Sequence, residues 1–279
     1  MSTPSDRAVE RAGLSSAVAR MKGLLTACRY LTALPLPRAD DTDDLGWAAV
    51  WFPLVGLALG GVLALAAIGA DLVTPPSVAA VLVVALWALL TGGLHLDGLG
   101  DALDGLGGGF GREAALRLMR TGGIGAYGAT GIVLVLAVKI AVLGSLPDDL
   151  LWRGLVLAPG LGRGAPVLLA RLCRPARMEG AGHAFSLGVG TVALAVTGGT
   201  GLAAAIGLLG PWGIVPLGAV LLATGLFAAY LRWRLGGFTG DCLGALVEAT
   251  EALVLVVLAA FDYLDLNWGL HWGASGAEI

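Results

Sequence analysis

Hydrophobic residues occur along this chain in long runs that contain few or no charges. A helix needs about 20 apolar residues to cross a hydrocarbon core of about 30 Å. We therefore expect an all-α polytopic integral membrane protein with about seven transmembrane helices, all within one transmembrane domain at 46–264. The predicted spans are 47–70, 72–94, 122–146, 150–172, two spans within the uncharged stretch 184–231, divided at the turn-like Gly210-Pro211, and 243–264.

The composition agrees with a membrane protein and excludes a single water-soluble core. Of the 279 residues, 57% are hydrophobic and only 13% are charged, whereas soluble domains carry about a quarter charged residues. The 45 glycines suit the close approach of helices within a bilayer. The formal net charge of -3 gives no sign of a basic nucleic-acid-binding surface, so we expect no nucleic-acid partner.

Basic residues predict how the chain is oriented in the membrane. With seven spans, the N-terminus and the loops after spans two, four and six share one side and hold 14 of the 17 Lys and Arg residues, leaving Lys139, Arg153 and Arg163. Because positively charged loops stay in the cytoplasm, the N-terminus is predicted inside and the C-terminus outside. Lys139 falls near the external end of its span and is expected to snorkel to the membrane surface.

The two ends of the chain are predicted to lie outside the spans. Residues 1–45 are expected to form a cytoplasmic tail that includes an amphipathic interfacial helix at 17–37, in contact with membrane lipid. Residues 265–279 contain no Lys or Arg and are expected to form an external tail.

Three aspartates follow the second predicted span at helical spacing. Asp97, Asp101 and Asp104 are at positions i, i+4 and i+7, which share one narrow face of a helix. Clustered carboxylates beside a membrane are costly without a cation, and oxygen ligands with room for water and phosphate favour Mg²⁺. The alternative is a solvated acidic loop. His95, next to the cluster, is either a catalytic group or a hydrogen-bonded interfacial residue.

Basic residues and glycines come next along the chain. Arg112, Arg117 and Arg120 precede the glycine-rich run 122–128. Guanidinium groups and an exposed glycine backbone can bind phosphate oxygens, although the arginines could equally be membrane-surface anchors. The run lacks the spacing of a phosphate-binding loop, so an ATPase is not indicated.

A second polar segment precedes the last predicted span. Asp241 and Glu248 are seven residues apart, on one helix face, and Glu251 lies a turn further on. Carboxylates inside a span need partners, and Arg163 is either such a partner, in a structural ion pair, or a phosphate contact. Asp241 is either a working residue of the site or the N-cap of the last span.

Five motifs resemble those of the cobalamin synthase (adenosylcobinamide-GDP ribazoletransferase) family. They occur in the family's order within residues 25–260, and the segments 120–123 and 173–185 depart from the family pattern. The motifs are LTALPLP at 31–37, FPLVG at 52–56, GLHLDGLGDALDG at 93–105, IGAYG at 124–128 and GFTGDCLGA at 237–245, the last followed by Glu248 and Glu251.

The resemblance implies an activity and a set of roles. It implies transfer of the adenosylcobinamide-phosphate moiety from adenosylcobinamide-GDP to α-ribazole or its 5′-phosphate, with Mg²⁺, by a multi-pass enzyme of the bacterial inner membrane whose active site faces the cytoplasm. A homo-oligomer is left open. The expected residues are Asp97, Asp101 and Asp104 for metal, Asp104, His95 and Asp241 for catalysis, Arg112, Arg117, Arg120 and Arg163 for phosphate, and Glu248 and Glu251 in support.

Other membrane proteins fit the sequence less well. A CDP-alcohol phosphotransferase has a different aspartate spacing, and a prenyltransferase carries aspartate-rich motifs in two helices, whereas the second segment here has Asp241 alone. A secondary transporter would be expected to contain inverted repeats, and the sequence shows no sign of them.

Overall fold

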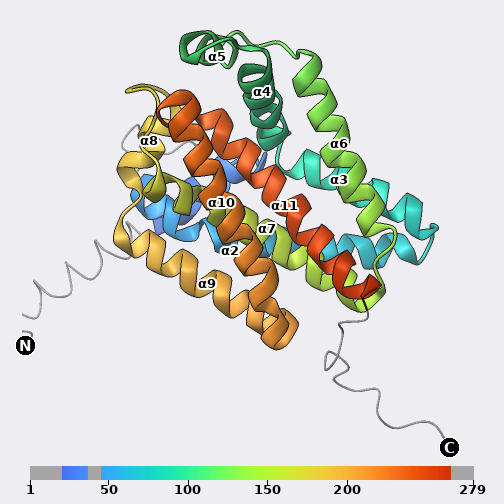
Figure 1. Cartoon of the computed structure of the whole chain (residues 1–279). Helices are drawn as coiled ribbons and strands as arrows, with labels where there is room; N and C mark the ends of the chain where they lie inside the picture. The colour runs from blue at the N-terminus through green and yellow to red at the C-terminus, as the bar shows by residue number, and fades with distance from the viewer. Residues whose placement is uncertain (1–20, 37–44, 265–279) are drawn as a thin grey trace, which may run out of the picture.

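The computed structural model describes residues 21–36 and 45–264, and this part of the chain is built from helices (Figure 1). A helical segment at 21–31 precedes α2, and within the described residues one isolated bridge, Pro175 to Phe238, is the β-type pairing. The elements are α2 (Leu45–Asp71), α3 (Pro76–Leu90), α4 (Leu94–Gly108), α5 (Arg112–Leu118), α6 (Ala126–Leu143), α7 (Asp148–Leu172), α8 (Ala181–Gly188), α9 (Thr191–Leu209), the 3₁₀ helix η1 (Gly210–Gly213), α10 (Ile214–Leu235) and α11 (Gly240–Tyr263).

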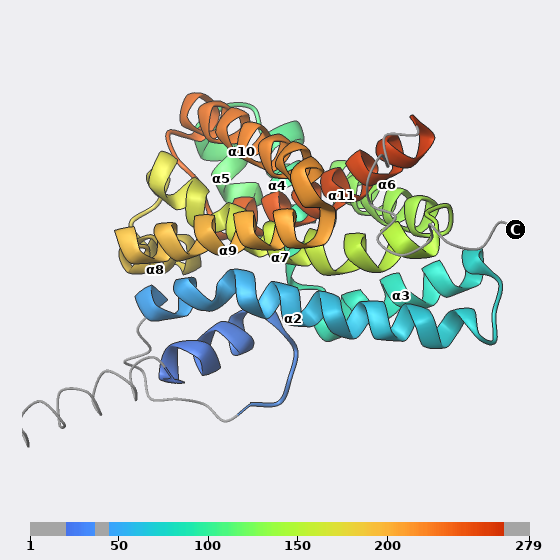
Figure 2. The ribbon, with the colours of Figure 1, turned by 90° about the horizontal axis from the view of Figure 1, so that it is seen from below.

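The helices confirm a polytopic membrane protein. In the described residues, five helical segments are long and apolar enough to cross a membrane, or six if a bent pair of helices counts as one span. One of the five is the 45-residue segment Thr191–Leu235, which includes η1. The chain turns back at η1, so that α9 and α10 form a hairpin, as the Gly210-Pro211 dipeptide predicted (Figures 1 and 2).

The second predicted span, 72–94, is not a straight helix. Its apolar part, α3, has only 15 residues and meets α4 at an angle of 87°. Gly92 and Gly93 make the bend, because both have positive φ angles, of 62° and 68°, a conformation that glycine adopts without strain. The bend turns α4, which carries the three aspartates, away from the direction of α3.

Close glycine contacts set the packing of the central helices. α7 packs along α2 and against α11. A Cβ atom added to Gly56 would lie 2.3 Å from the carbonyl oxygen of Pro159, and one added to Gly60 would lie 2.4 Å from that of Leu155. Glycines at such contacts let helix backbones approach closely and gain packing energy that lipid cannot supply.

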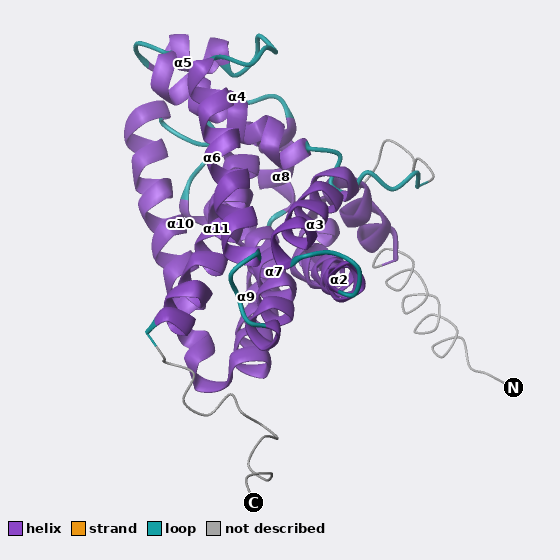
Figure 3. Ribbon diagram, turned by 90° about the vertical axis from the view of Figure 1, so that its right-hand side faces the viewer, coloured by secondary structure: helices purple, strands orange, loops and turns teal. Residues whose placement is uncertain are grey.

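The polar segments gather at one end of the bundle. α4 and α5 lie at the end of the bundle that is far from the last turn of α11 (Figures 1 and 3). The Arg112 side chain donates hydrogen bonds to the carbonyl oxygens of Leu235, at the end of α10, and Ala176, in the loop after α7. The loops predicted to follow spans two, four and six therefore do lie together.

The ends of the chain are only partly described. Residues 21–31 are helical, and Ala27 and Leu31 belong to one buried cluster with Ala48 and Phe52 of α2 (Figure 2). The remainder of the predicted interfacial helix, the N-terminal tail and the external tail at 265–279 lie outside the described residues.

Candidate functional site

The acidic centre of the site forms where α4 crosses α11. A Cβ atom added to Gly98 would lie 3.1 Å from the carbonyl oxygen of Asp241 and 3.2 Å from the Cα of Gly244. This close crossing brings Asp97 and Asp101 beside Asp241, and the charges of Asp97, Asp104 and Asp241 all act on Asp101. Asp97 is exposed, whereas Asp101 and Asp241 are half-buried. Carboxylates from two distant segments thus share one open region.

The donor set fits a magnesium ion that protein and substrate hold together. In the described part of the chain, no group of three or more His, Cys, Asp or Glu side chains is close enough to hold a metal by itself. Mg²⁺, however, is usually bound through one or two carboxylates, with water and substrate phosphates as the other ligands. Asp97, Asp101 and Asp241 could supply those carboxylates.

Asp104 has a different environment from the other aspartates. Its Oδ2 accepts a hydrogen bond from the backbone N–H of Gly125 at 2.6 Å, and its Oδ1 accepts one from Gly128 at 2.9 Å. A Cβ atom added to Gly125 or Gly128 would lie 2.5 Å or 2.4 Å from these oxygens. Asp104 therefore links α4 to the first turn of α6 through two hydrogen bonds. This structural role differs from the two roles that the sequence predicted, metal ligand and catalytic base.

Thr239, rather than Asp241, is the N-cap of α11. Its Oγ1 accepts a hydrogen bond from the N–H of Cys242 at 3.3 Å and donates one to Oδ2 of Asp241 at 3.1 Å. The capping alternative for Asp241 is therefore wrong. The Asp241 carboxylate stands in the first turn, where the helix dipole favours a negative charge, and Thr239 orients it.

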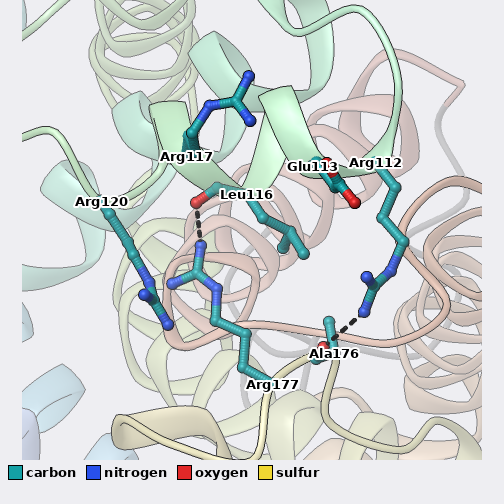
Figure 4. A pocket seen from close by; sticks show the side chains of 7 residues that line it. All are labelled: Arg112, Glu113, Leu116, Arg117, Arg120, Ala176 and Arg177. Carbon is teal, nitrogen blue, oxygen red and sulfur yellow. Dashed lines mark hydrogen bonds between the residues drawn. The ribbon is translucent and has the colours of Figure 1, made fainter.

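A basic cavity of about 370 Å³ lies beside the acidic centre (Figure 4). Arg112 is committed to Leu235 and Ala176 through its hydrogen bonds of 2.7 Å and 2.8 Å. Arg117 extends away from the other arginines, whereas Arg120 lies next to Arg177 (Figure 4). The lining residues are Arg112, Glu113, Leu116, Arg117, Arg120, Ala176 and Arg177.

Arg177 is a site residue that the sequence did not single out. It comes from the loop after α7 and donates a hydrogen bond to the carbonyl oxygen of Leu116 in α5. Burial and the positive charge of Arg120 lower the pKa of Arg177. The residue lies in the segment 173–185, where the family motifs are weakest, so only its position in space reveals it.

The buried carboxylates form a separate ionic cluster inside the bundle. Lys139 lies 2.6 Å from Glu248 and 2.5 Å from Glu251, and Arg163 pairs with the other oxygen of Glu251. Lys139 is 3% exposed and stacks over the ring of Trp87 at 4.2 Å. The expectation that Lys139 snorkels is therefore wrong: hydropathy located its span but not the carboxylates of α11 that face it.

Arg163 and His95 belong to this interior rather than to the basic cavity. Arg163 is 1% exposed and does not line that cavity, so the structure favours the ion pair over the predicted phosphate contact. His95 is 5% exposed, and the positive charges of Arg163 and Lys139 act on it. Its backbone packs against Gly244.

Comparison with known proteins identifies the family. The family model described as cobalamin-5-phosphate synthase matches residues 23–259. The chain belongs to the cobalamin-5-phosphate synthase family. It is therefore a transferase of cobalamin biosynthesis, as the five motifs indicated.

Several relatives of this chain are named adenosylcobinamide-GDP ribazoletransferase. The protein of Geotalea daltonii is 39% identical over 241 residues, covering 84% of this chain and 95% of its own. That of Chlorobaculum tepidum is 36% identical (90% and 99% covered), and that of Pseudomonas aeruginosa strain UCBPP-PA14 is 41% identical (86% and 98% covered). No solved structure matches the chain significantly.

Proposed function

We propose that this synthase transfers the adenosylcobinamide-phosphate moiety of adenosylcobinamide-GDP to α-ribazole or its 5′-phosphate in a Mg²⁺-dependent reaction that releases GMP. The names of the relatives support this substrate pair. The observation that carries the proposal is the neighbourhood, at one end of the bundle, of carboxylates and arginines that form no ion pair within the described residues. A magnesium diphosphate needs both, because carboxylates hold the metal and guanidinium groups neutralise phosphate oxygens.

The reaction is a displacement at phosphorus. A ribose hydroxyl oxygen of the acceptor forms the new P–O bond, and the bond to the bridging oxygen breaks, with its electron pair leaving on GMP. Asp97 and Asp101 are the metal ligands in this proposal. Mg²⁺, when bound, neutralises the charge that develops on the phosphate oxygens.

Asp241 is the best-placed group to take the hydroxyl proton. Both oxygens of Asp104 already accept backbone hydrogen bonds, and His95 is buried beside Arg163. Asp241 is half-buried, oriented by Thr239, and adjacent to the α4 aspartates. Its carboxylate can therefore take the proton from a hydroxyl group in line with a phosphate, which the Mg²⁺ ion held by Asp97 and Asp101 would bind.

The proposed site faces the cytoplasm of a bacterial inner membrane. The distribution of 14 basic residues against 3 supports this orientation, and the cluster at α4, α5 and the loop after α7 lies at the predicted cytoplasmic end. Labelling of a cysteine introduced at Ser275 from outside intact cells would support the orientation, and labelling only after lysis would contradict it.

The activity is tested with purified protein in detergent. We expect GMP release from adenosylcobinamide-GDP that requires both Mg²⁺ and α-ribazole. Neither a CDP-alcohol phosphotransferase nor a prenyltransferase nor a transporter predicts this product. Absence of GMP release from monodisperse, folded protein would contradict the proposal.

A further inference from the structure

A second cavity, of about 120 Å³, adjoins the basic one. Thr239 and Asp241 contribute to it from the start of α11, and Glu179 and His183 contribute from the other side. Arg177 is the residue that the two cavities share. Its side chain thus stands between a compartment lined by arginines and one that contains the Asp241 carboxylate.

In the described part of the chain, arginines outnumber carboxylates around Arg177: Glu113 lines the same cavity, and the charge of Asp241 acts favourably on Arg177. Arg112, Arg117, Arg120 and Arg177 form no ion pair with any residue in the described ranges 21–36 and 45–264. Arg120 and Arg177 nevertheless lie side by side (Figure 4), and the charge of Arg120 acts unfavourably on Arg177. Two adjacent guanidinium groups without a carboxylate between them are stabilised by an anion that both can contact.

We propose that Arg177 contacts the phosphate group that is transferred, with the leaving nucleotide phosphate in the basic cavity and the acceptor hydroxyl in the Asp241 cavity. This inference rests on the proposed function. In-line displacement places the attacking and leaving oxygens on opposite sides of phosphorus. The phosphorus then lies at the boundary of the two cavities, and Arg177 lines both.

The residues around Arg177 have different roles. Arg112 is held by two backbone carbonyl oxygens and positions the loop that carries Arg177. Arg120 makes no side-chain hydrogen bond in the described structure and is free to contact the leaving phosphate together with Arg177. Leu116 fixes the Arg177 guanidinium through its carbonyl oxygen, so the group is positioned before substrate binds.

The test compares Arg177→Gln and Arg120→Gln with Arg171→Gln, a control that removes an exposed arginine from the last turn of α7. GDP and inorganic pyrophosphate, each with Mg²⁺, are titrated into protein in phosphatidylcholine nanodiscs. Because a charge-assisted hydrogen bond is lost, we expect affinity to fall at least about tenfold in Arg177→Gln. The control should stay within about twofold, a change typical of surface substitutions.

Turnover provides the second measurement. The kcat of GMP release should fall by about 100-fold or more in Arg177→Gln, as when one donor to a developing charge is removed. If Arg177→Gln is unstable, Arg120→Gln, which breaks no hydrogen bond to another described residue, still tests whether the basic cavity binds the leaving phosphate. Its GDP affinity should also fall by about tenfold.

Three outcomes would overturn or redirect the inference. Unchanged GDP affinity in folded Arg177→Gln and Arg120→Gln would overturn it. Competition with GDP by phosphatidylglycerol in the nanodisc, lost in Arg177→Gln, would show that the cavity binds a lipid headgroup and would also overturn it. Arg177-dependent GDP binding without GMP release from adenosylcobinamide-GDP would refute the proposed function while leaving Arg177 as a diphosphate contact.

Discussion

Two groups of charged residues in this bundle differ in how their charges are balanced. In the interior, two cations, Lys139 and Arg163, face two anions, Glu248 and Glu251, at ion-pair distance, and all four are at most 5% exposed. At the end of the bundle, carboxylates gather with carboxylates and arginines with arginines. There, among the described residues, the carboxylates lie near the arginines but form no ion pairs with them.

The difference separates architecture from chemistry. A charge buried in a membrane protein is costly unless it is paired, and in the interior cluster the fold itself supplies an opposite charge to each ionised group. The segregated charges at the open end repel one another, and the proposed binding of a cation and an anionic substrate would make them favourable. The same residue types therefore serve two purposes, and pairing within the fold distinguishes them.

The largest expected effect is loss of turnover on removal of an α4 carboxylate. Asp97→Asn and Asp101→Asn should lower kcat by about 10⁴-fold or more, because the proposed Mg²⁺ ion would supply several kcal/mol of transition-state stabilisation. Thermal unfolding should remain unchanged, since Asp97 is exposed and Asp101 is half-buried. Asp71→Asn, an exposed residue at the end of α2, is the control and should retain full activity.

Substitutions in the interior cluster should lower the stability of the protein. Glu251→Gln leaves Arg163 and Lys139 without their shared carboxylate, and breaking a buried ion pair in this way costs about 3–5 kcal/mol. The measurement is thermal unfolding in detergent, with Asp262→Asn, an exposed site on the same helix, as the control. A Glu251→Gln protein as stable as this control would show that the cluster is not structural.

Asp241 belongs to the open group and should affect rate more than stability. Asp241→Asn removes the charge and the proton acceptor while Thr239 still caps α11. Turnover should fall by about 10²-fold or more, the loss expected when a reacting group is no longer positioned. Activity within a few-fold of wild type would confine the site to α4.

Hydropathy and motif spacing predicted the helical membrane fold, the hairpin at Gly210-Pro211 and the shared helix of the three aspartates. They could not predict partners across the bundle. Lys139 is 109 residues from Glu248 in sequence, and nothing in a local window shows that α6 and α11 face each other. A span prediction can therefore place a charged residue in the correct helix and still give it the wrong role.

Local backbone geometry explains the second error. The apolar run 72–94 continues smoothly through the bend, and only the pair Gly92-Gly93 signals that the helix can stop there. Arg177 was missed for the opposite reason: its segment has no periodicity or motif, and its importance comes from two cavities that meet in space. Functional residues in loops without periodicity or a motif therefore cannot be predicted from the sequence pattern alone.

We expect substitution of Asp104 to leave the Mg²⁺ requirement of the reaction unchanged, unlike substitution of Asp101. Asp104→Asn places an NH₂ group against one of the two N–H donors at the start of α6, so that one of the two hydrogen bonds is lost, at a cost of about 1 kcal/mol. The Mg²⁺ concentration for half-maximal rate should stay unchanged in Asp104→Asn and rise in any residual activity of Asp101→Asn. A raised Mg²⁺ requirement in both variants would restore Asp104 as a metal ligand.

Substitution of Thr239 should have the smallest effect on turnover, and comparison with Asp241→Asn tests whether Thr239 acts only by orienting Asp241. Thr239→Ala removes the N-cap of α11 and the hydrogen bond to Asp241, and loss of a cap costs about 1 kcal/mol. Turnover well below the unfolding temperature should fall by about tenfold, less than in Asp241→Asn, because a hydrogen bond to an ionised carboxylate contributes about 1.5 kcal/mol or more and the carboxylate itself remains. Thr239→Ser should restore both stability and rate. If Thr239→Ala instead matched the 10²-fold loss of Asp241→Asn, the hydroxyl itself would have to contact substrate, and the Asp241 cavity would need Thr239 as a second functional group.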